Sequence, residues 1–151
     1  MKIYLFSLFF IFSLVGCAVN PVTGKQDFVM ISEEQEIQMG REYNSQILKM
    51  NSVYQDQELQ EYVQSIGESL ALKSHRPNLI YRFTVLDSPD INAFALPGGY
   101  IYINRGLMSY FSSEEELAAV LGHEIGHVTA RHSVRQYSPV SYTHLTLPTK
   151  A

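Results

Sequence analysis

The chain has 151 residues, 46% of them hydrophobic, which suffices for one domain with its own core. Its formal net charge of −4 at pH 7 gives no reason to expect a nucleic-acid partner. Its single cysteine excludes an internal disulfide.

Residues 1–16 are predicted to be a lipoprotein signal peptide. The apolar stretch from Ile3 to Val15 is too short for a comfortable membrane span. It ends with the small residue Gly16 before Cys17, which is similar to the lipobox where bacterial signals are cut before a lipid-modified cysteine. Lipid chains on Cys17 would anchor the protein to a membrane, and Ala18 favours the outer membrane. The alternatives are an ordinary signal peptide and an N-terminal anchor with an incidental cysteine.

Two helices are predicted after an exposed linker at residues 17–31. The first is expected to begin with a capping box at Ser32 and to run to about residue 49, with three inward side chains: Ile37, Tyr43 and Ile47. The second is expected over about residues 56–74, with an apolar face formed by Leu59, Val63, Ile66 and Leu70. Gly67 inside it costs about 1 kcal/mol relative to alanine.

Three strands are expected next. Residues 80–86 alternate apolar and polar side chains, and residues 91–96 form a second strand. Pro97-Gly98-Gly99 has the composition of a tight turn, after which residues 100–104 return as a third strand. The resulting hairpin either only packs on the core, or it places an edge strand beside a cleft where an extended peptide can add to the sheet. The sequence leaves both interpretations open.

A further helix is predicted from Ser113, which caps it together with Glu116. An acidic first turn suits the helix dipole. One face is apolar and is expected to be buried: Leu117, Val120, Leu121, Ile125 and Val128. Small residues, among them Gly122 and Gly126, are expected to allow another backbone to approach closely.

This helix carries His123-Glu124-Ile125-Gly126-His127, at the spacing that a hydrolytic zinc site needs. Four residues span about 400° of helical rotation, so His123 and His127 lie one above the other and can bind one zinc ion. Glu124 points to one side and can act as general base without filling a coordination position. The alternative, surface histidines on an ordinary helix, is disfavoured by the apolar flanks.

A catalytic zinc usually has a third protein ligand, and none is evident here. No Asp, Glu or Cys follows His127, and His132 would face away, as a structural or supporting residue. The longer pattern H-E-x-x-H-x-x-G-x-x-H fails at Ala130 and Ser133. We therefore expect a catalytic domain truncated before its third ligand and inactive by itself. Two arginines are expected to form ion pairs near the helix end: Arg131 and Arg135.

Residues 139–151 are predicted to be a non-native tail, which leaves residues 32–138 for the domain. They contain no acidic residue and no clear periodicity. Codons for Val140 to Thr149 fit one reading frame of a transposase-based sequencing adaptor, and His144 then has no functional meaning. A natural loop or strand is the alternative.

Two segments, Asn92 to Met108 and Glu115 to Val128, closely resemble the zinc metallopeptidases that include HtpX-type heat-shock peptidases and CAAX prenyl peptidases. The chain looks most like their soluble, periplasmic lipoprotein branch, which residues 17–24 also resemble. The resemblance covers about residues 17–137 and is most specific in residues 91–132.

The resemblance implies an α+β, zincin-like domain, here incomplete, with helices and a small sheet beside the active-site helix. His123 and His127 correspond to the zinc ligands, with one Zn²⁺ per subunit, and Glu124 to the catalytic glutamate. Asn92 and Ala93 match the strand that lines the substrate cleft. The family's third ligand is a glutamate on a later helix, and a downstream histidine or arginine helps to hold the oxyanion; this chain lacks both.

The expected function is zinc-dependent endoproteolysis of unfolded or misassembled envelope proteins, for quality control. The enzyme would be anchored through Cys17 to the outer membrane and face the periplasm. The alternative is a non-catalytic, zinc-binding lipoprotein that holds unfolded clients by strand addition, as a chaperone does. A third hypothesis is that this stretch has no cellular role.

Overall fold

The computed structural model describes residues 18–19, 26–27 and 31–134. The predicted signal peptide, the predicted lipidation site Cys17 and the predicted tail at residues 139–151 lie outside this part of the chain. Within the described residues, no helix combines the length and the apolar character that a membrane crossing requires.

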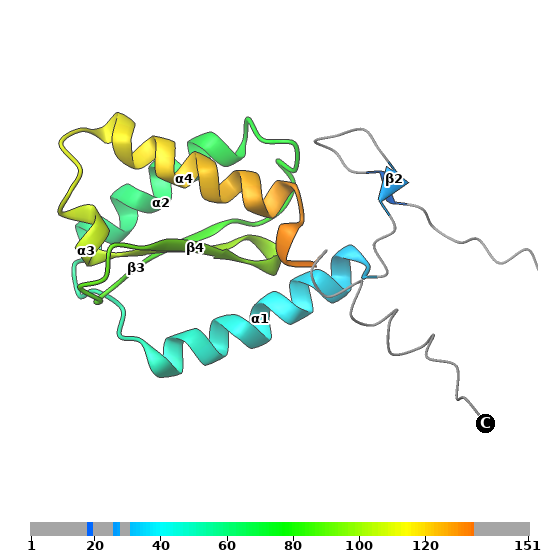
Figure 1. Cartoon of the computed structure of the whole chain (residues 1–151), viewed down its shortest axis with the longest axis horizontal. Coiled ribbons are helices and arrows are strands. Elements are labelled where there is room, and N and C mark those ends of the chain that lie inside the picture. Colours follow the sequence, from blue (N-terminus) through cyan, green and yellow to red (C-terminus); the bar gives the residue numbers. More distant parts are fainter. Residues whose placement is uncertain (1–17, 20–25, 28–30, 135–151) are drawn as a thin grey trace, which may run out of the picture.

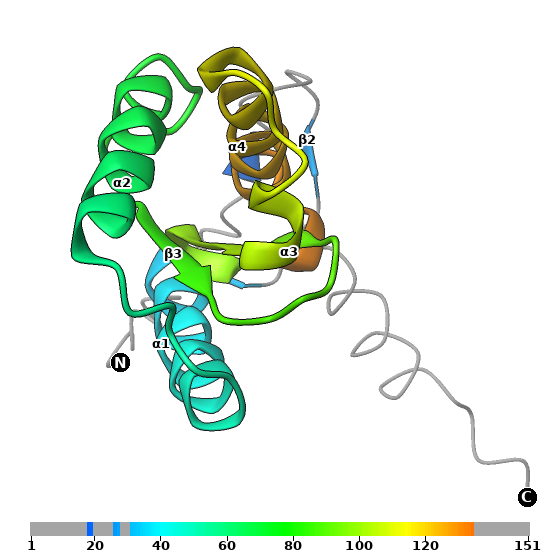
Figure 2. The same cartoon turned by 90° about the vertical axis from the view of Figure 1, so that its left-hand side faces the viewer.

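The described domain has three layers, with a small sheet between helices on its two faces (Figure 1). Helices α2 (Gln57–Ala71) and α4 (Glu114–Thr129) lie side by side on one face. Helix α1 (Glu33–Met50) crosses the opposite face, as the end-on view shows (Figure 2). This arrangement of helices and a mixed sheet confirms the predicted α+β class.

The sheet has the strand order β3-β5-β4. Strands β4 (Ala93–Leu96) and β5 (Tyr100–Asn104) form the predicted antiparallel hairpin, joined by a short 3₁₀ turn, η1 (Pro97–Gly99). Strand β3 (Arg82–Leu86) pairs parallel to β5 on its other side, which the sequence did not predict. Every residue of β5 is buried, because β5 has a strand on each side and helices over both faces.

Two glutamines of α2 close the outer edge of β3. The amide oxygens of Gln60 and Gln64 accept hydrogen bonds from the backbone N–H groups of Val85 (2.9 Å) and Phe83 (2.8 Å). Their amide nitrogens donate to the carbonyls of Val85 (3.0 Å) and Tyr81 (3.2 Å). Side chains thus replace a neighbouring strand, which leaves β3 with few free groups for edge-to-edge pairing.

The main core lies between the sheet and the helix pair α2/α4. Its buried side chains come from both layers: Val63, Ile66, Phe83, Val85, Ile101, Ile103, Leu117, Leu121, Ile125 and Val128. The aromatic ring of Phe83 lies against the backbone of Gly67, where an added Cβ would come within 2.3 Å of the ring. Gly67 is therefore explained by close packing of α2 on β3.

The buried residues of helix α1 differ from the predicted ones. Its predicted inward residues Ile37, Tyr43 and Ile47 are only partly buried, whereas its fully buried residues are Glu36 and Gly40. At Gly40 the helix presses against η1, since an added Cβ would lie 2.1 Å from the carbonyl oxygen of Pro97. The predicted capping box at Ser32 is confirmed.

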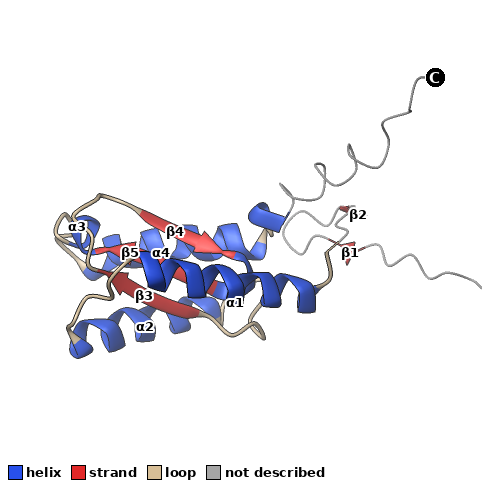
Figure 3. Ribbon diagram, turned by 90° about the horizontal axis from the view of Figure 1, so that it is seen from below, coloured by secondary structure: helices blue, strands red, loops and turns tan. Residues whose placement is uncertain are grey.

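The remaining described elements are short. Helix α3 (Arg105–Met108) follows β5 directly and was not predicted. Strands β1 (Ala18–Val19) and β2 (Gln26–Asp27) pair antiparallel within the segment predicted to be a linker. Figure 3 shows them beyond one end of the sheet, near the start of α1.

Candidate metal and catalytic site

The candidate site is built on α4, which begins as predicted. The hydroxyl of Ser113 accepts a hydrogen bond from the backbone N–H of Glu116 (3.4 Å). The carboxylate of Glu116 in turn accepts from the backbone N–H of Ser112 (2.7 Å), one residue earlier than a standard capping box. Gly122 and Gly126 do not serve close packing, because no described atom lies within 4 Å of a Cβ added at either position.

The rings of His123 and His127 converge. Their Nε2 atoms are 3.0 Å apart, and the rings meet edge to face with centroids 4.6 Å apart. Nitrogen ligands at about 2.0–2.1 Å from a tetrahedral zinc ion are about 3.3–3.4 Å from each other. The two nitrogens need to separate by only a few tenths of an ångström, so this pair fits a zinc ion. The predicted facing of these two side chains is thus found.

His132 lies against the same site, contrary to the expectation that it faces away. Its Nδ1 is 2.7 Å from Nδ1 of His127, on the side of the ring opposite to His123. The chain reaches this position because α4 ends at Thr129 with Ala130 as its C-cap, and Arg131 then adopts a left-handed conformation with φ of 54°. This turn breaks the helical rotation from which the facing of His132 was predicted.

The described residues contain no group of three or more His, Cys, Asp or Glu side chains arranged to hold a metal ion. The Nε2 atoms of His123 and His127 are the pair that fits one ion, so within this part of the chain the donor set provides two of the three protein ligands of a usual catalytic zinc site.

Glu124 is 8% exposed and shares an open groove with His123. The groove has a volume of about 370 Å³ and lies between α4, α3 and the segment that enters β4. Its lining includes the two residues predicted from the family resemblance, Asn92 and Ala93, with Ile91, Leu107, Ala119 and Val120. Sequence analysis did not assign the last four residues to the groove, because no local pattern brings α3 to β4.

Strand β4 borders this groove as an edge strand. The backbone N–H of Asn104 donates to the carbonyl of Asn92 (2.9 Å). This bond shows which alternate residues of β4 hydrogen-bond to β5. Backbone groups of Phe94 therefore point toward β5, and those of Ala93 and Ala95 point away from it. The sequence left open whether this hairpin only packs on the core; the structure shows an edge strand beside His123 and Glu124.

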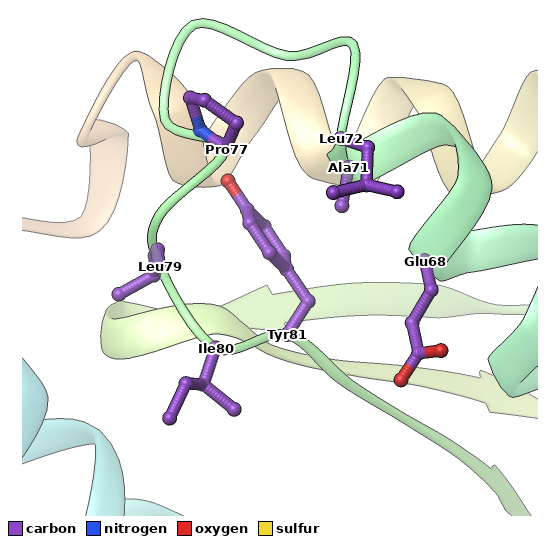
Figure 4. Close-up of a pocket in the computed structure, with 7 residues that line it drawn as sticks. All are labelled: Glu68, Ala71, Leu72, Pro77, Leu79, Ile80 and Tyr81. Carbon is purple, nitrogen blue, oxygen red and sulfur yellow. The ribbon is translucent and has the colours of Figure 1, made fainter.

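A second hollow, of about 220 Å³, lies where α2 meets the segment before β3 (Figure 4). Its lining is mainly apolar: Glu68, Ala71, Leu72, Pro77, Leu79, Ile80 and Tyr81. The hydroxyl of Tyr81 is buried without a hydrogen-bond partner among the described residues. Burial raises the pKa of this phenol, against the opposing influence of Ser74 and Arg76. The hollow shares no lining residue with the groove at Glu124.

The fold and the paired histidines define a class of metal-dependent hydrolase in which the active-site helix lies on a small mixed sheet. Residues 57–148 match peptidase family M48, and the chain belongs to this family. This match confirms the predicted metallopeptidase class and zincin-like fold, but it does not single out the HtpX-type and CAAX peptidases or their lipoprotein branch. The match runs into the predicted tail, whose non-native origin stays a prediction.

Named relatives share the matched region. The beta-barrel assembly-enhancing protease of Escherichia coli (strain K12) is 35% identical over 115 residues, 76% of this chain and 24% of that protein. A putative protease of the same description from Vibrio cholerae is 36% identical over 102 residues, 68% of this chain and 21% of that protein. The mitochondrial metalloendopeptidase OMA1 of Arabidopsis thaliana is 38% identical over 84 residues, 56% of this chain and 17% of that protein. The chain thus spans a quarter or less of the length of these relatives.

Proposed function

We propose that the chain is part of a zinc-dependent endopeptidase that acts on unfolded or misassembled proteins of the bacterial cell envelope. The observation that carries this proposal is the convergence of the Nε2 atoms of His123 and His127, with Glu124 next to them in a groove bordered by an edge strand. Membership of peptidase family M48 supports the same chemistry.

His123 and His127 would hold one Zn²⁺ per subunit. When bound, the ion supplies Lewis-acid chemistry that polarises a scissile carbonyl and makes water more acidic. Glu124 would accept the proton of the attacking water and deliver it to the leaving amine. Glu124 is largely buried, and charge interactions are stronger in such a position than in bulk water.

The substrate would bind as an added strand on β4. The outward backbone groups of Ala93 and Ala95 can pair with an extended peptide, while Asn92 lines the groove at the same edge. The glutamines on α2 cover the β3 edge, so β4 is the edge of this sheet left for pairing. An extended segment of an unfolded protein can supply such a strand without first leaving a sheet of its own, which favours unfolded clients.

Two further parts of the proposal rest on sequence. The relatives named as beta-barrel assembly-enhancing proteases support envelope proteins as substrates and a periplasmic location. The residues around Cys17 support a lipid anchor, and Ala18 supports the outer membrane. Assignment to the lipoprotein branch of the family depends on the same segment.

The third zinc ligand would come from outside residues 31–134, and by the family resemblance it is a glutamate. We propose that the 151-residue chain by itself binds zinc weakly and cleaves poorly, as expected for a catalytic domain truncated before that ligand. A version extended by the uninterrupted genomic reading frame beyond Ser138 would supply it.

The test compares Glu124→Gln with His123→Ala in the chain and in its extended version. Glu124→Gln should keep bound zinc and lose about 10²–10⁴-fold in cleavage of unfolded casein, because only the base is removed. His123→Ala should lose both metal and cleavage. Zinc content is measured by elemental analysis after dialysis. Unchanged turnover in Glu124→Gln, or an extended wild type without bound zinc, would refute the assignment.

The alternative is a zinc-binding holdase, and the open β4 edge beside the exposed Ile91 is the observation in its favour. A holdase would suppress aggregation of unfolded casein without cleaving it, and Glu124→Gln would leave that suppression unchanged. Cleavage by the extended wild type that is lost in Glu124→Gln decides for the peptidase.

A further inference from the structure

The turn that ends α4 is fixed by a buried charge network. Arg131 adopts the left-handed conformation that non-glycine residues avoid, and its guanidinium is held on two sides. Its Nε donates to Oε2 of Glu36 (2.8 Å), and its Nη2 donates to the carbonyl of Ile31 (2.8 Å). The start of α1 therefore fixes the residue that follows the C-cap of α4.

Glu36 is the centre of this network. Its side chain is 1% exposed, and its Oε1 accepts a hydrogen bond from Nη1 of Arg76 (2.9 Å). Arg76 also donates to the last turn of α4, at the carbonyl of Val128 (3.3 Å), and pairs with Glu33 (2.8 Å). Burial disfavours the charge of Arg76, but the hydrogen bonds and attraction of Glu36 and Glu33 outweigh it and raise its pKa above the ordinary value.

The network has a consequence for the metal ligand His127. The residue after Arg131 is His132, whose Nδ1 lies 2.7 Å from Nδ1 of His127. Two neutral nitrogens at this distance share one proton, so one ring donates and the other accepts. When His127 donates from Nδ1, its Nε2 carries a lone pair, and that atom is the one that faces Nε2 of His123.

We propose that Glu36, Arg131 and His132 are positioning residues for His127. Glu36 holds Arg131 in its left-handed turn, this turn places His132 against Nδ1 of His127, and the contact fixes the tautomer that presents Nε2 to a metal. The inference rests on the proposed metal site for its consequence, but the tautomer is a property of the metal-free protein as well. Removing such a supporting partner typically weakens metal binding about 10–100-fold.

The first measurement is made without metal, on the full chain. Nitrogen-15 shifts of the His127 ring report which nitrogen carries the proton. Wild type and His132→Gln should show the Nδ1–H tautomer, since the glutamine oxygen can accept the same hydrogen bond. His132→Leu, of similar size but without an acceptor, should show a mixture dominated by Nε2–H. The same tautomer in His132→Leu and wild type would overturn the proposal.

The second measurement is the cobalt affinity of the version extended beyond Ser138, followed by visible absorption and chelator competition. Glu36→Gln should bind Co²⁺ about 10-fold or more weakly than wild type, with an altered spectrum. Glu33→Gln is the matched control, because it removes an exposed partner of the same arginine on the same helix, and it should stay within twofold. Equal affinities in folded Glu36→Gln and Glu33→Gln would overturn the role of Glu36.

If Glu36→Gln does not fold, the variants His132→Gln and His132→Leu still test the proposal, because His132 is exposed. Two outcomes separate this inference from the proposed function. If the extended wild type shows the Nδ1–H tautomer but binds no cobalt, the metal site fails while the positioning of His127 stands. If it binds cobalt without a preference for either tautomer, the positioning role fails and the metal site stands.

Discussion

Replacing Gly67 by alanine tests the close packing of α2 against β3. In a solvent-exposed helix this change stabilises by about 1 kcal/mol, because glycine loses more backbone freedom on folding. Here the new methyl group would lie 2.3–2.5 Å from three ring atoms of Phe83, well inside van der Waals contact. Phe83 is 5% exposed and stacks with Tyr81 at a centroid distance of 6.3 Å, so its ring cannot move away freely.

The expected result for Gly67→Ala is a net loss of stability. Overpacking a buried site typically costs about 1–3 kcal/mol, and the gain in helix propensity offsets about 1 kcal/mol of it. We expect Gly67→Ala to lower the free energy of unfolding by up to about 2 kcal/mol. The matched control is Gly122→Ala on α4, where no described atom lies within 4 Å of the added methyl group, and a gain of about 1 kcal/mol is expected.

The assay is urea denaturation followed by far-ultraviolet circular dichroism, with linear extrapolation to water. The two variants make the same chemical change in two helices, so the difference between them isolates the contact with Phe83. An equal gain in stability from both substitutions would refute the close packing of α2 against β3.

Three further predictions concern the sheet. Ala95→Pro removes an N–H group that points away from β5, so it should retain the β4–β5 ladder and weaken binding of an unfolded peptide in fluorescence anisotropy. Phe94→Pro removes an N–H group that points toward β5 and should lose about 3 kcal/mol of stability. Equal peptide affinity in Ala95→Pro and wild type would contradict strand addition. Gln64→Ala should cost about 1–3 kcal/mol and speed hydrogen exchange at a β3 amide, while the exposed Gln38→Ala should change stability by less than about 0.5 kcal/mol. Burial raises the pKa of Tyr102 to about 12, so its absorbance at 295 nm should titrate there. The folded state holds this proton more tightly than the unfolded chain, whose tyrosine pKa is about 10, so stability should fall as pH rises from about 10 to 12; a flat profile would contradict the burial of the phenol.

The interactions predicted correctly from the sequence are local in the chain. The facing of His123 and His127 follows from helical rotation alone, and the cap at Ser32 involves residues three positions apart. The hairpin of β4 and β5 follows from a turn of proline and two glycines, whose φ values of 74° at Gly98 and 92° at Gly99 glycine adopts without strain.

The failed prediction for His132 depends on where a helix stops. His132 was placed by continuing the rotation of α4, but the helix ends at Thr129, with Ala130 as its C-cap. A left-handed residue at the end of a helix is usually glycine or asparagine. Positions 130 and 131 are Ala130 and Arg131, so the sequence gives no local signal for this turn. The turn is held instead by Glu36, 95 positions earlier in the chain.

The sequence by itself therefore determined that two imidazoles and a carboxylate lie together on one helix with a buried face, because each of their relations spans four residues or fewer. Only the tertiary structure decided which surfaces meet at that helix. The parallel pairing of β3 with β5, the groove between α4 and the entry to β4, and the burial of Glu36 between two arginines all join distant segments. Such contacts depend on which amphipathic faces pack together in one core, and the periodicity of a single helix or strand does not show which partner it packs against.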